Sequence, residues 1–207
     1  MKNIVVLVSG GGTNLQALID AQKSGAIKDG KITCVISSKE GAYALERAEK
    51  AGIKTLTLPR KHFCDNRAYS EALLRVLSEL HADLIVYAGF MTILDRVVCD
   101  AYPNKMMNVH PALIPSFCGK GFYGLHVHEA ALAKGVKLTG ATVHFVTAEC
   151  DGGPIILQKA VEVKDGDTPE TLQKRVMEQA EWKILPQAVS MFCEGRLTVK
   201  NERVYIS

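Results

Sequence analysis

The sequence lacks long hydrophobic runs, blocks of basic residues and closely paired cysteines. Its first residues, MKNIVVLVSGGG, carry one early lysine and a short apolar run, but glycines interrupt that run too soon for a signal peptide or a membrane-spanning helix. The formal net charge of +3 is spread along the chain, without the Lys/Arg stripes expected of a nucleic-acid-binding protein. We therefore expect a cytoplasmic protein that binds a small anionic ligand and neither nucleic acid nor membrane.

The cysteines and histidines form no recognisable metal or redox motif. The six cysteines are scattered, and none forms a C-x-x-C pair. His126 and His128 have the spacing of a metal-binding pair, but Glu129 does not complete the H-E-x-x-H motif. The residues around them are typical of a surface helix that starts near Gly124. The cysteines are expected to be reduced, and no metal site is expected.

Short apolar segments alternate with helical patterns along the chain, as in a parallel sheet with crossover helices. The 207 residues, 47% of them hydrophobic, suit one domain without repeats or linkers. The expected fold is α/β: a single Rossmann-like domain over residues 1–207, with a mostly parallel twisted sheet, helices on both faces and an antiparallel C-terminal portion. Strands are expected at Ile4–Val8, Ile32–Ile36, Lys54–Leu58, Leu84–Tyr87, Met106–Val109, Leu138–Val146 and Ile155–Val163.

Two helices have clear sequence signals. The helix after Asn66 has one apolar stripe, which should cover the sheet. The other begins in the segment 167–170, Asp-Thr-Pro-Glu, which supplies a cap, an early proline and an early acid, and Pro186 should kink it. The tail, Arg196–Ile206, is typical of a short hairpin around Asn201.

A glycine-rich turn, Ser9-Gly10-Gly11-Gly12-Thr13-Asn14, joins the first strand to a helix that begins near Asn14. Glycines let a backbone approach an anion closely, and the start of a helix offers unpaired N–H groups. Leu15 stands where the dinucleotide fingerprint has its third glycine, and the Gly-Lys-Ser/Thr ending of a P-loop is absent. The turn indicates phosphate binding without naming a ligand, and a purely structural strand-to-helix turn is the alternative.

The sequence NVHPALIP begins at Asn108, and its polar residues lie at the end of a predicted strand. Two residues apart on an extended chain, Asn108 and His110 point to the same side. An amide donates a hydrogen bond, and a histidine moves a proton or, when charged, stabilises an oxyanion. The pair suits a reaction that places negative charge on a carbonyl oxygen, although both side chains would also suit the capping of backbone groups.

Asp151 lies in a second turn, Cys150-Asp151-Gly152-Gly153-Pro154. A carboxylate beside an imidazole holds its tautomer and raises its pKa, so Asp151 is a candidate partner for His110. Turn capping is the alternative role. The alternation of the strand Leu138–Val146 places Thr142 and His144 on one face, and we expect both to face the same cleft.

Four segments together carry a family resemblance: IVVLVSGGGTNL, AGFMTIL, NVHPALIP and HFVTAECDGGPIILQ, which begin at Ile4, Ala88, Asn108 and His144. Their order and spacing resemble those of the folate-dependent phosphoribosylglycinamide formyltransferases of purine biosynthesis, along almost the whole chain. The resemblance implies formyl transfer from 10-formyltetrahydrofolate, as co-substrate, to the primary amine of phosphoribosylglycinamide, without a metal.

The resemblance also implies roles for particular residues. Asn108 and protonated His110 would stabilise the oxyanion, and Asp151 would raise the His110 pKa and order a water. Residues 1–105 would form the phosphate-binding half, and residues 106–207 the catalytic and folate-contacting half. The substrate phosphate and sugar would be held by Gly12, Thr13, Asn14 and Glu181, and the folate by Arg67, Met91, Thr92, Ile93, Leu94 and Asn108.

Three positions depart from the family pattern. Thr92 replaces a common Arg, Trp182 replaces the His that commonly follows the glutamate, and the loop Ser116–Tyr123 is longer than in short-loop members. The loop would act as a lid over the cleft or be a plain surface insertion.

Rival functions remain for the same catalytic core. A formyltetrahydrofolate hydrolase would carry an N-terminal regulatory domain, and methionyl-tRNA formyltransferase a C-terminal basic domain, so the length argues against both. A catalytically silent nucleotide-binding module is the rival from another class, and it has no evident need for the three polar residues. The expected assembly is a monomer or homodimer.

Overall fold

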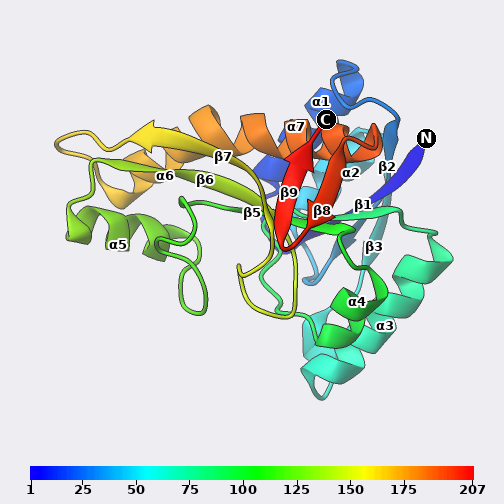
Figure 1. The fold of residues 1–207 in the computed structure, drawn as a ribbon. Helices are drawn as coiled ribbons and strands as arrows, with labels where there is room; N and C mark the ends of the chain where they lie inside the picture. The colour runs from blue at the N-terminus through cyan, green and yellow to red at the C-terminus, as the bar shows by residue number, and fades with distance from the viewer.

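Seven strands form one sheet in the order β3-β2-β1-β4-β5-β6-β7 in the computed structural model, which describes residues 1–207 (Figure 1). Strands β1 to β5 pair in parallel, whereas β6 pairs antiparallel with both β5 and β7. A separate hairpin pairs β8 with β9. The strands are β1 Lys2–Val8, β2 Gly30–Ser37, β3 Lys54–Thr57, β4 Leu84–Tyr87, β5 Met106–His110, β6 Leu138–Phe145, β7 Ile155–Glu162, β8 Leu197–Lys200 and β9 Arg203–Ile206.

Helices cover both faces of this sheet. They are α1 Thr13–Lys23, α2 Tyr43–Lys50, a short 3-10 turn η1 Arg60–His62, α3 Asn66–Glu79, α4 Arg96–Ala101, α5 Leu125–Lys134, α6 Pro169–Val176, a π-helical turn η2 Met177–Glu181 and α7 Trp182–Cys193. None of them is both long and apolar enough to cross a bilayer. The expected α/β fold, its mixed sheet and its C-terminal hairpin are confirmed.

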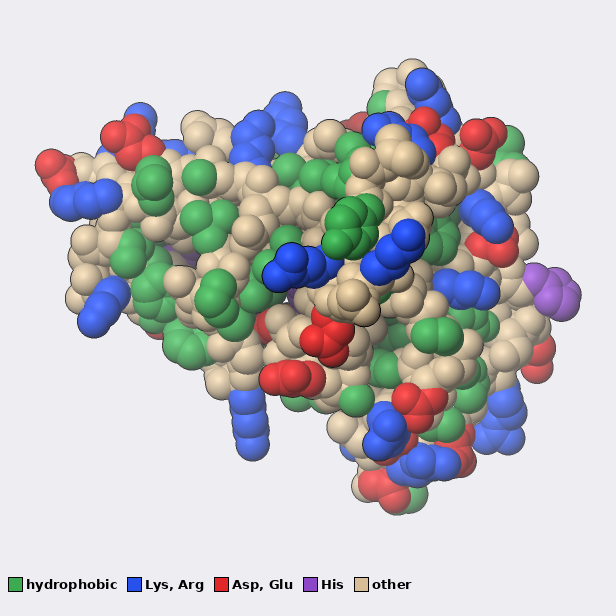
Figure 2. Space-filling view, viewed as in Figure 1, with side chains coloured by type: hydrophobic (Ala, Val, Ile, Leu, Met, Phe, Trp, Pro, Cys, Tyr) green, Lys and Arg blue, Asp and Glu red, His purple; other side chains and the backbone are tan.

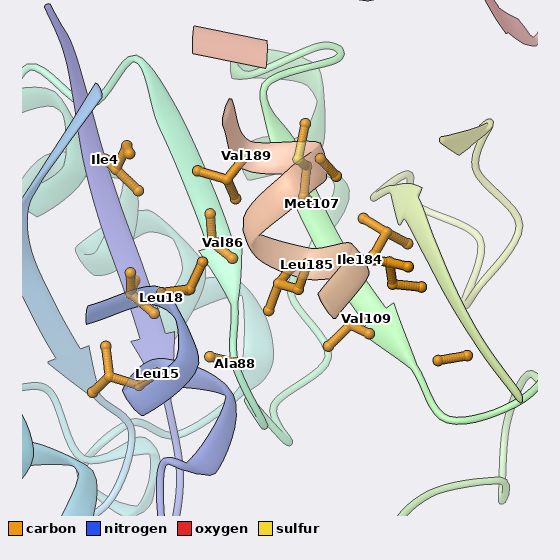
Figure 3. Close-up of a cluster of buried hydrophobic side chains, with 14 of the residues drawn as sticks. Ile4, Leu15, Leu18, Val86, Ala88, Met107, Val109, Ile184, Leu185 and Val189 are labelled. Carbon is orange, nitrogen blue, oxygen red and sulfur yellow. The ribbon is translucent and has the colours of Figure 1, made fainter. Parts of the chain in front are cut away.

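The core forms two apolar layers, one on each face of the sheet. Because side chains alternate along a strand, Val6 and Val8 of β1 face one layer and Val5 and Leu7 face the other. The first layer packs α1 and α7 onto the sheet, as Figure 3 shows for Leu15, Leu18, Leu185 and Val189. The second layer packs α3 and α4. Fully buried side chains of this kind each contribute about 1.5–3 kcal/mol through the hydrophobic effect.

The expected helix start near residue 168 is confirmed in detail. Thr168 caps α6 by accepting a hydrogen bond from Thr171 N, and Thr171 Oγ1 accepts one from Thr168 N. Pro186, where we expected a kink, lies buried within α7, and the π-helical turn Met177–Glu181 interrupts the α-helical pattern upstream of it. A π turn accommodates one extra residue, and helix-stop signals such as proline do not predict it.

Candidate active site

The candidate site lies where the chain reverses its order across the sheet. Strand β1 pairs with β2 on one side and with β4 on the other, so the connections that follow β1 and β4 leave in opposite directions and open a crevice. A cleft of about 800 Å³ occupies this end of the sheet. Its walls bring together Asn14, Met91, Thr92, Ile93, Leu94, Asn108, His110, Asp151 and Glu181.

A second groove, of about 910 Å³, runs between α1 and α7 and includes only Thr13 among the expected site residues. We place the site in the 800 Å³ cleft because it gathers the amide, imidazole and carboxylate groups that the sequence singled out. No group of three or more His, Cys, Asp or Glu side chains is arranged to hold a metal ion.

Strand β5 places His110 in the cleft beside Asp151. The ring is 4% exposed. His110 Nε2 donates to the carbonyl oxygen of Phe117 at 2.8 Å, because a carbonyl can only accept. His110 Nδ1 faces Asp151 Oδ2 at 3.6 Å, so the carboxylate attracts the ring when it is protonated, at a distance too long for a strong hydrogen bond. The expected meeting of His110 and Asp151 is therefore present in the structure.

The pKa of His110 reflects opposing effects. Burial lowers the pKa below its ordinary value, whereas the Phe117 carbonyl and the Asp151 charge act to raise it. Asp151 thus acts in the expected direction, but burial outweighs it. The protonation of His110 during the reaction stays a prediction, because burial works against the charged ring and the Asp151 carboxylate works for it.

Asp151 itself stays ionised. Burial raises its pKa, but hydrogen bonds from His144 and from Gly119 N, the latter at 2.9 Å, together with the nearby histidines, lower the pKa to about 2. Its backbone has a φ of 54°, in the left-handed region. Aspartate adopts this region more readily than most residues, which fits the turn that carries it.

His144 joins this cluster from the neighbouring strand β6. Its Nδ1 donates to the carbonyl oxygen of Phe145 at 2.9 Å, so Nε2 accepts from the Asn108 amide at 3.3 Å in the neutral ring and donates to Asp151 only in the protonated ring. The same Nε2 lies 3.5 Å from Asp151 Oδ1. Asn108 is therefore held by a long hydrogen bond, which a substrate oxygen is able to replace.

The glycine turn is built to leave its N–H groups free. Gly12 has a φ of 74°, and a Cβ at this position would lie 2.6 Å from the Cβ of Ala44, so only glycine fits without rearrangement. The carbonyls of Gly10 and Gly11 accept from Ala44 N and from Arg47 Nε, at 3.0 and 2.8 Å. No N–H group from Gly10 to Leu15 donates to a protein acceptor, so the start of α1 is a candidate anion site.

Glu181 reaches this turn from the last residue of the π turn. It is 6% exposed and accepts a hydrogen bond of 2.7 Å from Asn14 Nδ2. Burial raises the Glu181 pKa to about 7, and the Asn14 amide only partly opposes the shift. Asn14 Oδ1 is buried without a partner. The expected neighbours Asn14 and Glu181 thus form one polar pair in the cleft wall.

The segment from Met91 to Leu94 follows β4 without regular secondary structure. Met91 N donates to Ser9 Oγ at 2.9 Å, which ties the segment to the end of β1. The N–H groups of Thr92, Ile93 and Leu94 donate to no protein acceptor, and Ile93 is 57% exposed. The segment therefore presents free main-chain donors along the cleft.

Four expected residues do not line the cleft: Gly12, Thr13, Arg67 and Thr142. Arg67 is exposed and pairs with Glu71 and Asp95, at 2.6 and 3.3 Å. Gly12 lines neither this cleft nor the groove between α1 and α7, and Thr13 lines only that groove. Thr142 is fully buried, donates to the carbonyl of Ala112 and accepts from Ile114 N, so it holds the proline-rich segment instead of facing the cleft.

Two further segments form part of the cleft wall, one that the sequence argument did not single out and one that it expected as a lid or a surface insertion. The segment 147–150, before Asp151, and the loop residues Gly119 to Gly124 both line it. His128 lines it too and is fully buried, which corrects its placement on a surface helix; only His126 is exposed. The sequence spacing of the two histidines does not indicate which of them is buried.

Comparison with known proteins identifies the family. The family model described as formyl transferase matches residues 2–189. The chain belongs to the formyl transferase family. The structural match extends over the whole chain: glycinamide ribonucleotide transformylase 1 from Symbiobacterium toebii is 43% identical, with a TM-score of 0.93, covering 100% of this chain and 94% of that one.

The relatives confirm the resemblance deduced from the motifs. The phosphoribosylglycinamide formyltransferase of Escherichia coli is 43% identical over 204 residues, which cover 99% of this chain and 93% of that protein. A formyltetrahydrofolate deformylase from Pseudomonas syringae has the same fold, with a TM-score of 0.87 at 29% identity, but this chain covers only 65% of it. The closer match in sequence and in length is thus to the transferases.

Proposed function

We propose that this protein transfers a formyl group from 10-formyltetrahydrofolate to the primary amine of phosphoribosylglycinamide, in purine biosynthesis. The observation that carries the proposal is the single cleft that joins three kinds of group: the polar pair Asn14–Glu181 beside the anion site, the cluster of Asn108, His110 and Asp151, and free main-chain donors. The 43% identity to relatives that carry this activity in their names supports it.

The central cluster supports direct attack of the amine on the formyl carbon. As the carbonyl oxygen becomes negative, Asn108 donates to it, and the new charge favours the protonated form of His110 that burial otherwise disfavours. The cation thus forms when the transition state needs it. Asp151, already ionised, stabilises that cation and orders a water that relays the amine proton toward N10 of the departing folate.

The two ends of the cleft bind the two reactants. The free N–H groups of Gly12, Thr13 and Asn14 hold the phosphate of the glycinamide substrate, and Glu181 accepts hydrogen bonds from its sugar hydroxyls. Main-chain donors of residues 92–94 bind the polar edge of the pterin, and we assign Arg67, outside the cleft wall, to the acidic tail of the folate. Because main-chain groups make these contacts, Thr92 is tolerated in place of a larger side chain.

The loop Ser116–Tyr123 supplies the adjustable part of the site. Its Phe117 carbonyl accepts a hydrogen bond from His110 Nε2. Direct donation by Nε2 to the substrate oxygen therefore requires this carbonyl to move away. Gly119 and Gly121 have φ values of 89° and 96°, with open space at both Cβ positions, so the backbone of the loop can change conformation at these two residues. We assign it the role of a lid that exchanges the Phe117 contact for substrate.

The test is loss of 10-formyltetrahydrofolate by the purified protein, with and without phosphoribosylglycinamide. The proposal expects consumption that depends on the glycinamide. Consumption without it, with release of formate, would indicate a hydrolase, the activity named for the Pseudomonas syringae relative. If 10-formyltetrahydrofolate is consumed under neither condition, the proposal fails and the nucleotide-binding module is the remaining function.

A further inference from the structure

His128 is a buried polar side chain that no protein atom satisfies. It lies on α5, its ring is fully buried, and neither Nδ1 nor Nε2 has a hydrogen-bond partner. His126, two residues earlier on the same helix, is exposed, and its Nδ1 lies 3.0 Å from Glu129 Oε2. The exposed side chain, His126, is therefore paired, whereas the buried side chain, His128, is not.

Such a residue is costly to the fold. A neutral imidazole has one N–H donor and one bare acceptor nitrogen. Each buried polar atom without a partner costs about 1–3 kcal/mol. An apolar residue of similar size would avoid the cost, so a histidine at this position is better explained by function than by packing.

His128 contributes to the wall of the cleft, together with His110. Burial, and then the charge of His110, hold the pKa of His128 at about 4, so the ring is neutral at neutral pH and offers both a donor and an acceptor. The titratable groups of the same wall include His110, His144, Asp151 and Glu181. Of these, His144 and Asp151 already contact each other, and Glu181 is held by Asn14.

We propose that His128 is a binding residue of the cleft, whose ring nitrogens hold a small group that both donates and accepts hydrogen bonds beside His110. This inference rests on the proposed transferase function. Two sources supply that chemistry: the attacking amine of the substrate and an ordered water. In either case His128 positions the group for reaction.

The experiment compares His128→Leu with His128→Asn, and uses His126→Leu as the matched control on the same helix. His128→Leu removes two unpartnered atoms, so it is expected to melt at the same temperature as the parent or higher, while kcat/KM falls by about tenfold or more. His128→Asn keeps a donor and an acceptor and is expected to retain more activity than His128→Leu. His126→Leu is expected to leave kcat/KM unchanged.

The kinetic pattern identifies the group. A raised KM for the glycinamide together with a lower kcat assigns it to the amine, and a lower kcat at constant KM assigns it to a water. Full activity in a more stable His128→Leu would overturn the inference, and so would equal activity loss in both His128 variants with matching loss of stability. A parent protein without formyl transfer would instead refute the proposed function.

Discussion

Glu181→Gln tests the energetic cost of the buried carboxylate that holds Asn14. The amide has nearly the same shape, still accepts from Asn14 Nδ2, and adds a donor near the unpartnered Asn14 Oδ1. The substitution removes the ionisable carboxyl group. Burial raises the pKa of Glu181, so its ionised form costs folding free energy that the neutral amide avoids. Glu181→Gln should therefore stabilise the fold, and it should weaken binding of the sugar.

The magnitude follows from the shift in pKa. Burial moves the Glu181 pKa from an ordinary value of 4.5 to about 7. A group whose folded pKa is raised is fully favourable below its unfolded pKa, and its contribution is lost as the pH rises through the folded pKa. One pKa unit corresponds to about 1.4 kcal/mol, so the parent loses about 3 kcal/mol between about pH 4 and about pH 8 through this group alone.

Denaturant unfolding at both pH values measures the effect. The free energy of unfolding of Glu181→Gln, relative to the parent, is expected to rise by about 3 kcal/mol from the lower to the higher pH. Glu178→Gln is the matched control, because Glu178 lies exposed on the same π turn and its side chain meets only Lys174, at 3.9 Å. A stability difference that does not change with pH for Glu181→Gln would refute the assigned burial and pKa.

Three further changes probe the catalytic cluster and the anion site. Asp151→Asn removes the charge that raises the His110 pKa, so the requirement for protonated His110 should move to lower pH in the rate profile; an unchanged profile would argue against their coupling. His110→Ala should lower kcat by about 10²–10⁴ with little change in substrate binding, and equal losses in binding and turnover would contradict a transition-state role. Gly12→Ala should cost about 1–3 kcal/mol of unfolding free energy, because its Cβ would strike Ala44, and should weaken phosphate binding; wild-type stability would show that the turn adjusts.

Most of the fold was predictable because the central strands are buried on both faces. A strand of this kind is an unbroken apolar run, as in β1 and β4, and its position can be read from the sequence. The surface of the molecule was also predictable in character: on the face in Figure 2, Lys and Arg side chains are interspersed with Asp and Glu, without a broad patch of one sign.

The site was predictable where it lies at the end of one strand. Asn108 and His110 share a side because of the two-residue period of β5. Their meeting with Asp151 was a hypothesis, since it depends on the antiparallel pairing of β6, which brings His144 opposite Asn108 and the Asp151 turn above it. Long-range pairing of this kind has no local signal.

Burial decided what the sequence could not. His126 and His128 look alike in the chain, but only the packing of α5 against the rest of the fold shows which ring is covered. The net pKa of His110 likewise required the depth of the cleft, because the neighbouring carboxylate alone indicates the opposite direction. The π turn that carries Glu181 also has no simple sequence rule.

The central claim is transfer to an amine, and the fate of the formyl carbon tests it most directly. The protein would be incubated with 10-formyltetrahydrofolate labelled with carbon-13 in the formyl group, together with phosphoribosylglycinamide, and the products would be followed by NMR. The account predicts a labelled formamide on the glycinamide nitrogen and no labelled formate above background. Label appearing in formate, at the same rate with or without the glycinamide, would contradict it.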